Sequence, residues 1–434
     1  MTETNSSVSM KEATAKMKAD SFKMAALSLE KRNNILSAVK NALILNKVDI
    51  FAANDKDMEN AVAEGIDASV LKRLKFDEHK LKDVCAGIEQ LISLPDPINK
   101  VLLKRELDEG LTLNRISCPI GVIGIIFEAR PDALVQISSL CIKSGNCAVL
   151  KGGKETANTN RILFRLIYEA AVKNGAPEGC MLQAEAHSEI DELLACNKSV
   201  DLLIPRGSNR FVQYIMNNTK IPVMGHADGI CHTYVDRDAD ITKAVKIVLD
   251  AKTQYTAACN ATETLLVDRS IAPTALPAIS KALRESGVTL RGTKEVNDLV
   301  KLDEMMGEDE FNTEYLNLTI SVKLVDGVDE AISHINRFGS HHTDSIITEN
   351  METGERFMAL VDSAGTYLNC STRFADGFRY GFGAEVGIST SKIHARGPVG
   401  LEGLTTYKYK LYGNGHIVAE YQDGTRHFNF KDII

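Results

Sequence analysis

The chain has 434 residues, more than one hydrophobic core usually supports, so it is expected to form two or three domains. Its 44% hydrophobic and 25% charged residues exclude a disordered or fibrous protein. The net charge of −8 disfavours a nucleic-acid partner, because neutralising phosphates requires a basic surface.

The cysteines and the N-terminus indicate the compartment. None of the nine cysteines forms a CxxC pair, and the nearest two, Cys141 and Cys147, lack the spacing of zinc ligands. The N-terminal MTETNSSVSMKEATAKMK has no apolar stretch of about 7–15 residues, so no signal peptide is expected. No run of about 18 apolar residues occurs, so no membrane contact is expected. Free thiols without an export signal are typical of the reducing cytoplasm.

The predicted elements begin with helices. Residues from about 8 to 96 are rich in Ala, Leu, Lys and Glu, with apolar residues spaced by about 3.6. Residues 102–116 then alternate polar and apolar around Asp108-Glu109-Gly110, which predicts a β-hairpin.

From Pro119 onward, short apolar strands alternate with helices. The expected strands of this first series are GVIGIIF, CAVLK, CMLQA, DLLIP and IPVMG. A second series runs from residue 231 to about residue 395. This alternation predicts an α/β fold with parallel sheets that carry helices on both faces. In the tail, YKYKLYGNGHIVAEY predicts two strands that form a hairpin around Gly413-Asn414-Gly415.

Cys259 is the candidate nucleophile. It lies in YTAACNATETLLVD, where small neighbours would let a substrate carbonyl approach. A buried cysteine is more often a small hydrophobic residue. A reactive thiol needs positive potential nearby, and the local sequence supplies no cation.

Two strand–helix junctions are candidate anion sites. VLKGGKETANTN places Lys151, two glycines and Lys154 before a helix, and PRGSN places Gly207 and Ser208 in the same way. A helix N-terminus favours anions, so these junctions predict contact with a dinucleotide. Both the GxGxxG fingerprint and the GxxxxGK[ST] phosphate loop are missing.

A third junction, PIGVIGIIFEARPD, ends a strand with a charged turn. Ligands of α/β folds bind at the carboxyl ends of parallel strands, which makes Arg130 a candidate ligand residue. The alternative is an ion pair of Arg130 with Glu128 or Asp132 that only stiffens the turn.

Histidines invite a metal interpretation, but no metal site is expected. The adjacent His341 and His342 should point in different directions, and no third ligand lies at a useful spacing. His226 and His232 are discounted as ligands for similar reasons.

These stretches, in this order, resemble the aldehyde dehydrogenase superfamily, and most closely its γ-glutamyl phosphate reductase branch. The resemblance covers essentially the whole chain. The most specific strings are VGISTSKIHARGPVG, FGSHHTDSI, DLLIPRGSNR, IPVMGHADGICHTYVD and ACNATETLLV.

The resemblance implies roles for individual residues. Cys259 matches the catalytic cysteine, whose backbone N–H, with Asn260 nearby, would hold an oxyanion. Arg130 stands where ordinary members carry an oxyanion-holding Asn.

The cofactor residues follow in the same way. Lys151 matches a lysine that contacts the adenosine ribose, and Glu314 matches a glutamate that holds the nicotinamide ribose. The helix at Gly207-Ser208 matches the one beneath the pyrophosphate. Lys154 falls where NAD-preferring relatives carry a ribose-binding Glu, which implies NADPH (NADP) as cofactor. An alignment shift by one residue would place Glu155 there instead.

His226 replaces the Glu general base of hydrolytic members. Because hydrolysis of a thioester needs a base that activates water, this departure favours a reaction that starts from an acyl phosphate. The implied reaction is reduction of L-glutamyl 5-phosphate to L-glutamate 5-semialdehyde, the second step of proline biosynthesis. The alternatives are a hydrolytic or CoA-acylating member, or a non-catalytic protein on the same fold.

The resemblance also implies the organisation of the chain. A cofactor-binding domain would comprise residues 1–101 and 118–229, and a catalytic domain residues 230–398. Residues 102–117 and 399–434 would form an oligomerisation flap of a homo-oligomer, either a dimer or a tetramer. The substrate L-glutamyl 5-phosphate and a contact with glutamate 5-kinase complete the expected partners.

Overall fold

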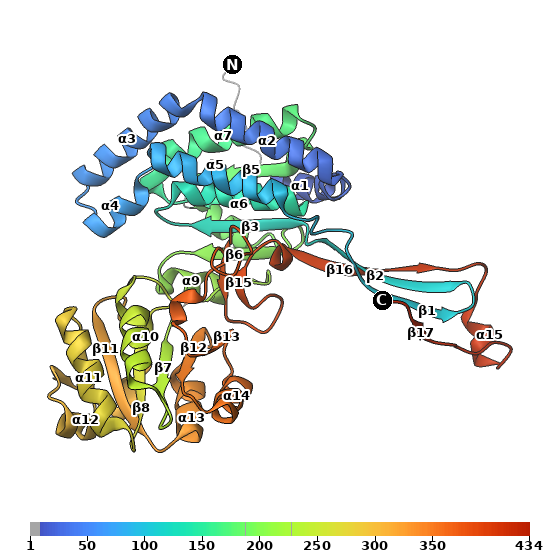
Figure 1. The fold of residues 1–434 in the computed structure, drawn as a ribbon. Coiled ribbons are helices and arrows are strands. Elements are labelled where there is room, and N and C mark those ends of the chain that lie inside the picture. The colour runs from blue at the N-terminus through green and yellow to red at the C-terminus, as the bar shows by residue number, and fades with distance from the viewer. Residues whose placement is uncertain (1–8, 187, 227) are drawn as a thin grey trace. The chain divides into compact units, whose positions relative to one another are not determined.

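The computed structural model describes residues 9–186, 188–226 and 228–434 (Figure 1). The chain divides into two compact units. The first spans Met1–Met224, Phe382–Gly387 and Val399–Ile434, and the second spans Gly225–Gly381 and Ile388–Pro398.

The first unit begins with the expected helices. They are α1 (Met10–Ala25), α2 (Leu29–Leu45), α3 (Lys47–Ala63), α4 (Ala68–Leu74) and α5 (Glu78–Ser93). Side-chain caps explain where three of them begin: Ser9, Ser28 and Asp77 each accept a hydrogen bond from a backbone N–H of the first turn. At Ser9 the cap is a full capping box with Glu12.

A parallel sheet follows, with the strand order β5-β4-β3-β6. Its strands are β3 (Val122–Phe127), β4 (Cys147–Gly152), β5 (Met181–Ala184) and β6 (Leu202–Arg206). The connecting helices are α6 (Pro131–Ser144), η1 (Lys154–Thr156), α7 (Ala157–Lys173), η2 (Glu178–Cys180), α8 (Ser188–Leu194) and α9 (Asn209–Asn217). Every residue of β3 is buried, which explains its continuous apolar run.

One expected strand is wrong. The IPVMG segment forms only an isolated bridge between Val223 and Leu203. Pro222 has no backbone N–H to donate, so the ladder does not extend to the residues before this bridge.

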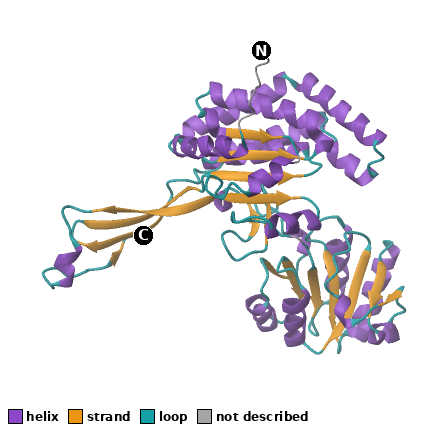
Figure 2. Cartoon of the chain, turned by 180° about the vertical axis from the view of Figure 1, so that it is seen from behind, coloured by secondary structure: helices purple, strands orange, loops and turns teal. Residues whose placement is uncertain are grey.

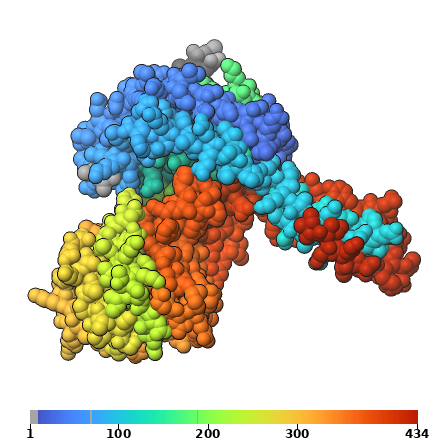
Figure 3. All heavy atoms as spheres, in the orientation of Figure 1, coloured from blue at the N-terminus to red at the C-terminus, as the bar shows by residue number. Residues whose placement is uncertain are grey.

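A four-stranded antiparallel sheet, here called the flap, completes the first unit, with the order β16-β2-β1-β17. Its strands are β1 (Val101–Asp108), β2 (Leu111–Pro119), β16 (Thr405–Tyr412) and β17 (Lys431–Asp432). The β1–β2 hairpin is confirmed, and Gly110 at its turn has a φ of +75°. In Figure 3 the flap's cyan and red segments lie side by side and extend away from the helices of the same unit.

The predicted tail hairpin is wrong. β16 pairs with β2 along its whole length, and the residues after Gly415 form the short helix α15 (Val418–Gln422). The segment VAEYQ is rich in residues that favour helix, and β2 already supplies the partner that β16 needs. A nearby 3-10 turn, η5, spans Glu402–Leu404.

The second unit is built on a seven-stranded parallel sheet with the order β10-β9-β11-β8-β7-β12-β13. Its strands are β7 (Cys231–Val235), β8 (Thr262–Asp268), β9 (Thr289–Gly292), β10 (Glu304–Met305), β11 (Thr319–Val325), β12 (Thr343–Ile347) and β13 (Gly365–Leu368). Its helices are α10 (Ile241–Thr253), α11 (Ala272–Glu285), α12 (Lys294–Leu299), η3 (Glu308–Glu310), α13 (Val328–Phe338), α14 (Met351–Leu360) and η4 (Thr372–Phe374). A separate two-stranded ladder joins β14 (Gly387–Ser389) to β15 (Gly397–Val399).

Helices cover both faces of this sheet (Figure 2). Val235 and Leu265 pack into one core cluster with α10 and α11, whereas their neighbours Tyr234 and Leu266 pack into the other with α13 and α14. Side chains alternate between the faces of a strand, so one apolar run fills both cores. The predicted α/β class is confirmed. Within the described part of the chain, no helix is long and apolar enough to cross a membrane.

Candidate active site

Cys259 lies in the turn between α10 and β8, and it is only partly buried. Gly229 and Ile230 precede β7, and His342 precedes β12. Because β8, β7 and β12 are neighbours in the sheet, these residues meet at its amino edge. The reactive thiol therefore lies at the opposite edge from the one where α/β folds usually bind ligands.

His342 contacts the thiol directly. Its Nε2 is 3.2 Å from the Cys259 Sγ, and its ring is fully buried. Its Nδ1 lies 3.0 Å from the Thr343 Oγ1 and 3.7 Å from the Cys231 Sγ. An imidazole in this position can accept the thiol proton and leave a thiolate. Sequence reasoning missed this role, because 83 residues separate the pair along the chain.

His226 is the third polar group at the thiol. Its ring stands nearly perpendicular to that of His342, with 4.8 Å between centroids. Its Nδ1 is 2.7 Å from the backbone oxygen of Ile388. A carbonyl only accepts, so the proton of a neutral His226 sits on Nδ1 and the Nε2 carries the lone pair.

Arg373 is a buried cation whose charge interacts with that of Cys259. Arg373 is 7% exposed, donates from Nε to the Gln254 Oε1 at 2.9 Å, and lies over the Tyr255 ring. Burial lowers the pKa of Arg373, and the charge of Cys259 acts in the opposite direction. The positive potential that the local sequence lacks is therefore supplied by tertiary contacts.

Gly229 contacts both the backbone of Cys259 and the side chain of Glu314. Its backbone N–H donates to the Glu314 Oε1 at 2.9 Å, and a Cβ at position 229 would overlap the backbone of Cys259. Only glycine allows this approach of two backbones.

A buried ion pair supports the loop that carries Glu314. Lys252 and Glu263 are fully buried, with 2.5 Å between Nζ and Oε2. The other oxygen of Glu263 accepts from the Leu316 N–H at 3.2 Å. Burial raises the pKa of Glu263 to about 7 and lowers the pKa of Lys252. The pair thus fixes the backbone two residues beyond Glu314.

Asn260 is buried, and its Nδ2 donates to the Ala375 oxygen at 2.8 Å. This bond holds the segment after η4 against the nucleophile turn. Within the described residues, the backbone N–H of Cys259 has no acceptor. That N–H is therefore available to a substrate oxygen.

The remaining candidates lie at the carboxyl edge of the parallel sheet of the first unit. Lys151 is buried at the end of β4 and donates to the Gly152 oxygen at 2.7 Å, and burial lowers its pKa. Lys154 is exposed, with its Nζ 3.0 Å from the Glu64 Oε2. Glu155 instead turns inward and accepts from the Ala129 N–H at 2.5 Å. Of the two residues that could face a ribose, Lys154 is the accessible one.

The N-terminus of α9 already holds an anion. Ser208 is its N-cap, and the Ser208 N–H donates to the Glu128 Oε2 at 3.0 Å. A Cβ at Gly207 would overlap that carboxylate. A phosphate of a dinucleotide that binds at this N-terminus would replace the Glu128 carboxylate as the acceptor of the Ser208 N–H.

Arg130 stands apart from its acidic neighbours. Asp132 pairs with Lys80 at 3.1 Å, and Glu128 is bound to α9. Across the described ranges, the Arg130 guanidinium forms no hydrogen bond or ion pair with another residue. The structure therefore gives no support to the turn-stiffening alternative.

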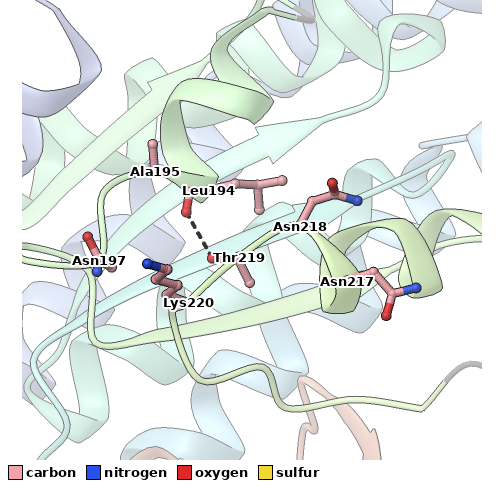
Figure 4. Close-up of a pocket in the computed structure, with 7 residues that line it drawn as sticks. All are labelled: Leu194, Ala195, Asn197, Asn217, Asn218, Thr219 and Lys220. Carbon is pink, nitrogen blue, oxygen red and sulfur yellow. Dashed lines mark hydrogen bonds between the residues drawn. The ribbon is translucent and has the colours of Figure 1, made fainter.

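The hollow in Figure 4 is separate from these residues. It encloses about 460 Å³ and is lined by Leu194, Ala195, Asn197, Asn217, Asn218, Thr219 and Lys220. It lies where α8 and α9 end, at the edge of the sheet opposite Lys151 and Ser208, and none of the candidate site residues lines it.

A thiol that contacts an imidazole in one α/β unit, and a helix N-terminus that binds a carboxylate in the other, are features of a cysteine-dependent dehydrogenase. Residues 2–297 match the aldehyde dehydrogenase family, and the chain belongs to that family.

Within the family, the chain is 54% identical to the gamma-glutamyl phosphate reductase of Acetivibrio thermocellus, over 98% of this chain and 99% of the relative. The solved gamma-glutamyl phosphate reductase of Thermotoga maritima superposes with a TM-score of 0.91 at 37% identity, covering 94% of this chain and 99% of that one. An acetylating aldehyde dehydrogenase from Geobacillus thermoglucosidasius shares the fold at 17% identity, with a TM-score of 0.63.

Proposed function

We propose that the protein reduces L-glutamyl 5-phosphate to L-glutamate 5-semialdehyde with NADPH and releases phosphate, as the second step of proline biosynthesis. The observation that carries the proposal is the 3.2 Å contact between the Cys259 Sγ and the His342 Nε2. This contact occurs in a chain that is 54% identical to a gamma-glutamyl phosphate reductase over 98% of the chain.

The reaction begins at this contact. His342 takes the proton of Cys259, and the thiolate attacks the γ-carbonyl carbon of the acyl phosphate. The C–O bond to phosphate breaks, phosphate leaves, and a thioester remains on Cys259. The unbonded Cys259 N–H donates to the oxygen that becomes negative during attack. One such donor contributes about 2.7–4 kcal/mol in other enzymes.

In the first unit, Lys151 and Ser208 would hold the adenosine ribose and the phosphates of a nicotinamide dinucleotide. In the second unit, Glu314 would hold a nicotinamide ribose, and the cofactor when bound supplies the hydride for the thioester carbon. The resulting thiohemiacetal collapses to the aldehyde, and Cys259 recovers its proton from His342. Position 226 carries a histidine bound to the Ile388 carbonyl rather than the Glu base of hydrolytic members.

The test of this function is to follow NADP reduction with glutamate 5-semialdehyde, with and without phosphate. Turnover that requires phosphate supports the proposal. Turnover without phosphate supports a hydrolytic dehydrogenase, and turnover that requires CoA supports an acylating one. A chain that oxidises nothing under any of these conditions would be the non-catalytic alternative.

Cofactor choice is expected to depend on Lys154. Replacing it by Glu should raise the KM for NADPH by roughly tenfold while changing the KM for NADH much less, because the new carboxylate repels the 2′-phosphate. Steady-state kinetics with both cofactors measure the effect. Glu64→Gln, which removes the ion-pair partner of Lys154 without charge reversal, is the control. Equal losses for both cofactors would mean that Lys154 only supports the loop.

Arg130 is proposed to bind the phosphoryl group of the substrate. Arg130→Lys keeps the charge but loses the two parallel N–H donors, so the KM for phosphate in the oxidative direction should rise by about tenfold or more. The KM for NADP and the melting temperature should barely change. The control is Asp132→Asn, which breaks the pair with Lys80 but leaves Arg130 in place. A lower melting temperature with normal phosphate kinetics would make Arg130 structural.

The flap is proposed to join copies of the chain into a dimer or tetramer. Its outer strand β16 exposes Tyr409 and Leu411 at 58% and 56%, and its edge has no partner strand within the described residues. Exposed apolar edge strands of this kind are sites of association. Sedimentation velocity of the full chain tests this, and a monomer would contradict it. The contact with glutamate 5-kinase stays a prediction.

A further inference from the structure

We propose that His226, Cys259 and His342 form a binding site for a soft divalent cation such as Zn²⁺, and that the bound metal reversibly inhibits the enzyme. No local sequence pattern indicates this site, because its donors come from three distant segments of the chain. One ligand atom from each residue lies within 4.8 Å of the others. The inference concerns the resting protein and does not depend on which substrate the enzyme reduces.

The donor set fits zinc. One thiolate and two imidazoles are ligands that Zn²⁺ prefers over Mg²⁺ or Ca²⁺. Around a tetrahedral zinc, donor atoms are separated by about 3.3–3.6 Å. The Cys259 Sγ and the His342 Nε2 are already 3.2 Å apart, so only a small movement of the His226 ring is needed. Water or a substrate oxygen would complete the coordination.

Hydrogen bonds behind the histidines prepare them as ligands. The Ile388 carbonyl lies 2.7 Å from the His226 Nδ1, and the Thr343 hydroxyl lies 3.0 Å from the His342 Nδ1. The carbonyl places the proton of a neutral His226 on Nδ1, whereas the Thr343 hydroxyl, which can donate or accept, orients the His342 ring. Residues outside the three ligands therefore hold both imidazole rings in place.

Binding has a direct chemical consequence. One Zn–S and two Zn–N bonds form, and the proton shared by Cys259 and His342 is released to solvent. A thiolate held by zinc cannot attack a carbonyl, so the metal-bound enzyme is inactive. When the metal is removed, Cys259 and His342 regain their shared proton, and the thiol can again act as the nucleophile.

Cobalt spectroscopy of the reduced, metal-free full chain tests the site without substrate or cofactor. Addition of Co²⁺ should produce a near-ultraviolet thiolate-to-cobalt band and visible bands of tetrahedral intensity, both saturating at one equivalent. Zn²⁺ should abolish these bands by displacing Co²⁺. In parallel assays, turnover should fall with bound Zn²⁺ and recover fully with a chelator.

Variants assign the ligands. Cys259→Ser should remove the thiolate band, and His226→Gln should weaken Co²⁺ binding by about 100-fold or more. The matched control is His341→Asn, which removes a neighbouring histidine whose Nδ1 bonds to the Asp362 carbonyl. It should bind Co²⁺ like the wild type.

The opposite results would overturn the inference. A thiolate band that survives in Cys259→Ser would assign the metal to another cysteine. Unchanged affinity in His226→Gln, in a protein with wild-type melting temperature, would exclude His226 as a ligand. Tight Co²⁺ binding by a chain that fails to reduce any acyl phosphate would leave this site standing while refuting the proposed function.

Discussion

Replacing Cys259 with alanine should abolish turnover and leave cofactor binding intact. The sulfur forms the covalent bond to the acyl group, so its loss should lower kcat by a factor on the order of 10⁴ or more. The residues expected to hold the cofactor, including Lys151 and Ser208, belong to other segments. Stopped-flow or steady-state assays measure the first effect, and fluorescence titration with NADPH measures the second.

Of two other cysteines, one serves as a control for this variant and the other is the next candidate nucleophile. Cys370→Ala should keep most of the activity, because Cys370 has no contact with His342 among the described residues. Cys231 lies 3.7 Å from the His342 Nδ1 and is the better second candidate. If Cys259→Ala kept more than a few per cent of wild-type activity, Cys259 would be removed from the mechanism and Cys231 would be tested next.

Replacing His342 with glutamine should lower kcat/KM by about 10²–10⁴-fold, the usual contribution of a positioned acid–base group. Glutamine fills similar space but cannot take the thiol proton. The rate at which iodoacetamide alkylates Cys259 should fall as well, since only the thiolate reacts quickly. This second measurement requires no substrate and reports on the thiol alone.

The adjacent histidine provides the control. His341 has a φ of +60°, which asparagine also tolerates, so His341→Asn should leave the backbone unchanged. Its alkylation rate and kcat should match the wild type. An unaltered alkylation rate in His342→Gln would show that another group activates the thiol, and Arg373, whose charge interacts with that of Cys259, would be tested next.

The fold was largely predictable from the sequence because its signals are local. The period of apolar residues distinguished the five N-terminal helices from the strands, and strand–helix alternation indicated parallel sheets. The errors arose where a tertiary partner decided the outcome. The Gly413-Asn414-Gly415 turn has the composition of a hairpin, but β16 had already paired with β2.

The site was predictable only in part for the same reason. Cys259 could be identified by its small neighbours and by resemblance, whereas its contact with His342 depends on β7 lying between β8 and β12. Strand order in a parallel sheet is set by long crossover connections, which a local pattern does not encode. For the same reason, no metal site is expected from the adjacent histidines in the sequence, whereas the fold brings His226 and Cys259 close to His342.

The separation of 83 residues between Cys259 and His342 also has a consequence during synthesis of the protein. A ribosome adds about 5–20 residues per second, so the cysteine is made roughly 4–17 s before the histidine that it contacts. During that interval the nascent chain carries the thiol without its base, and β12 has not yet joined the sheet. The pair that the proposed mechanism requires is therefore complete only after β12 has joined the sheet beside β7.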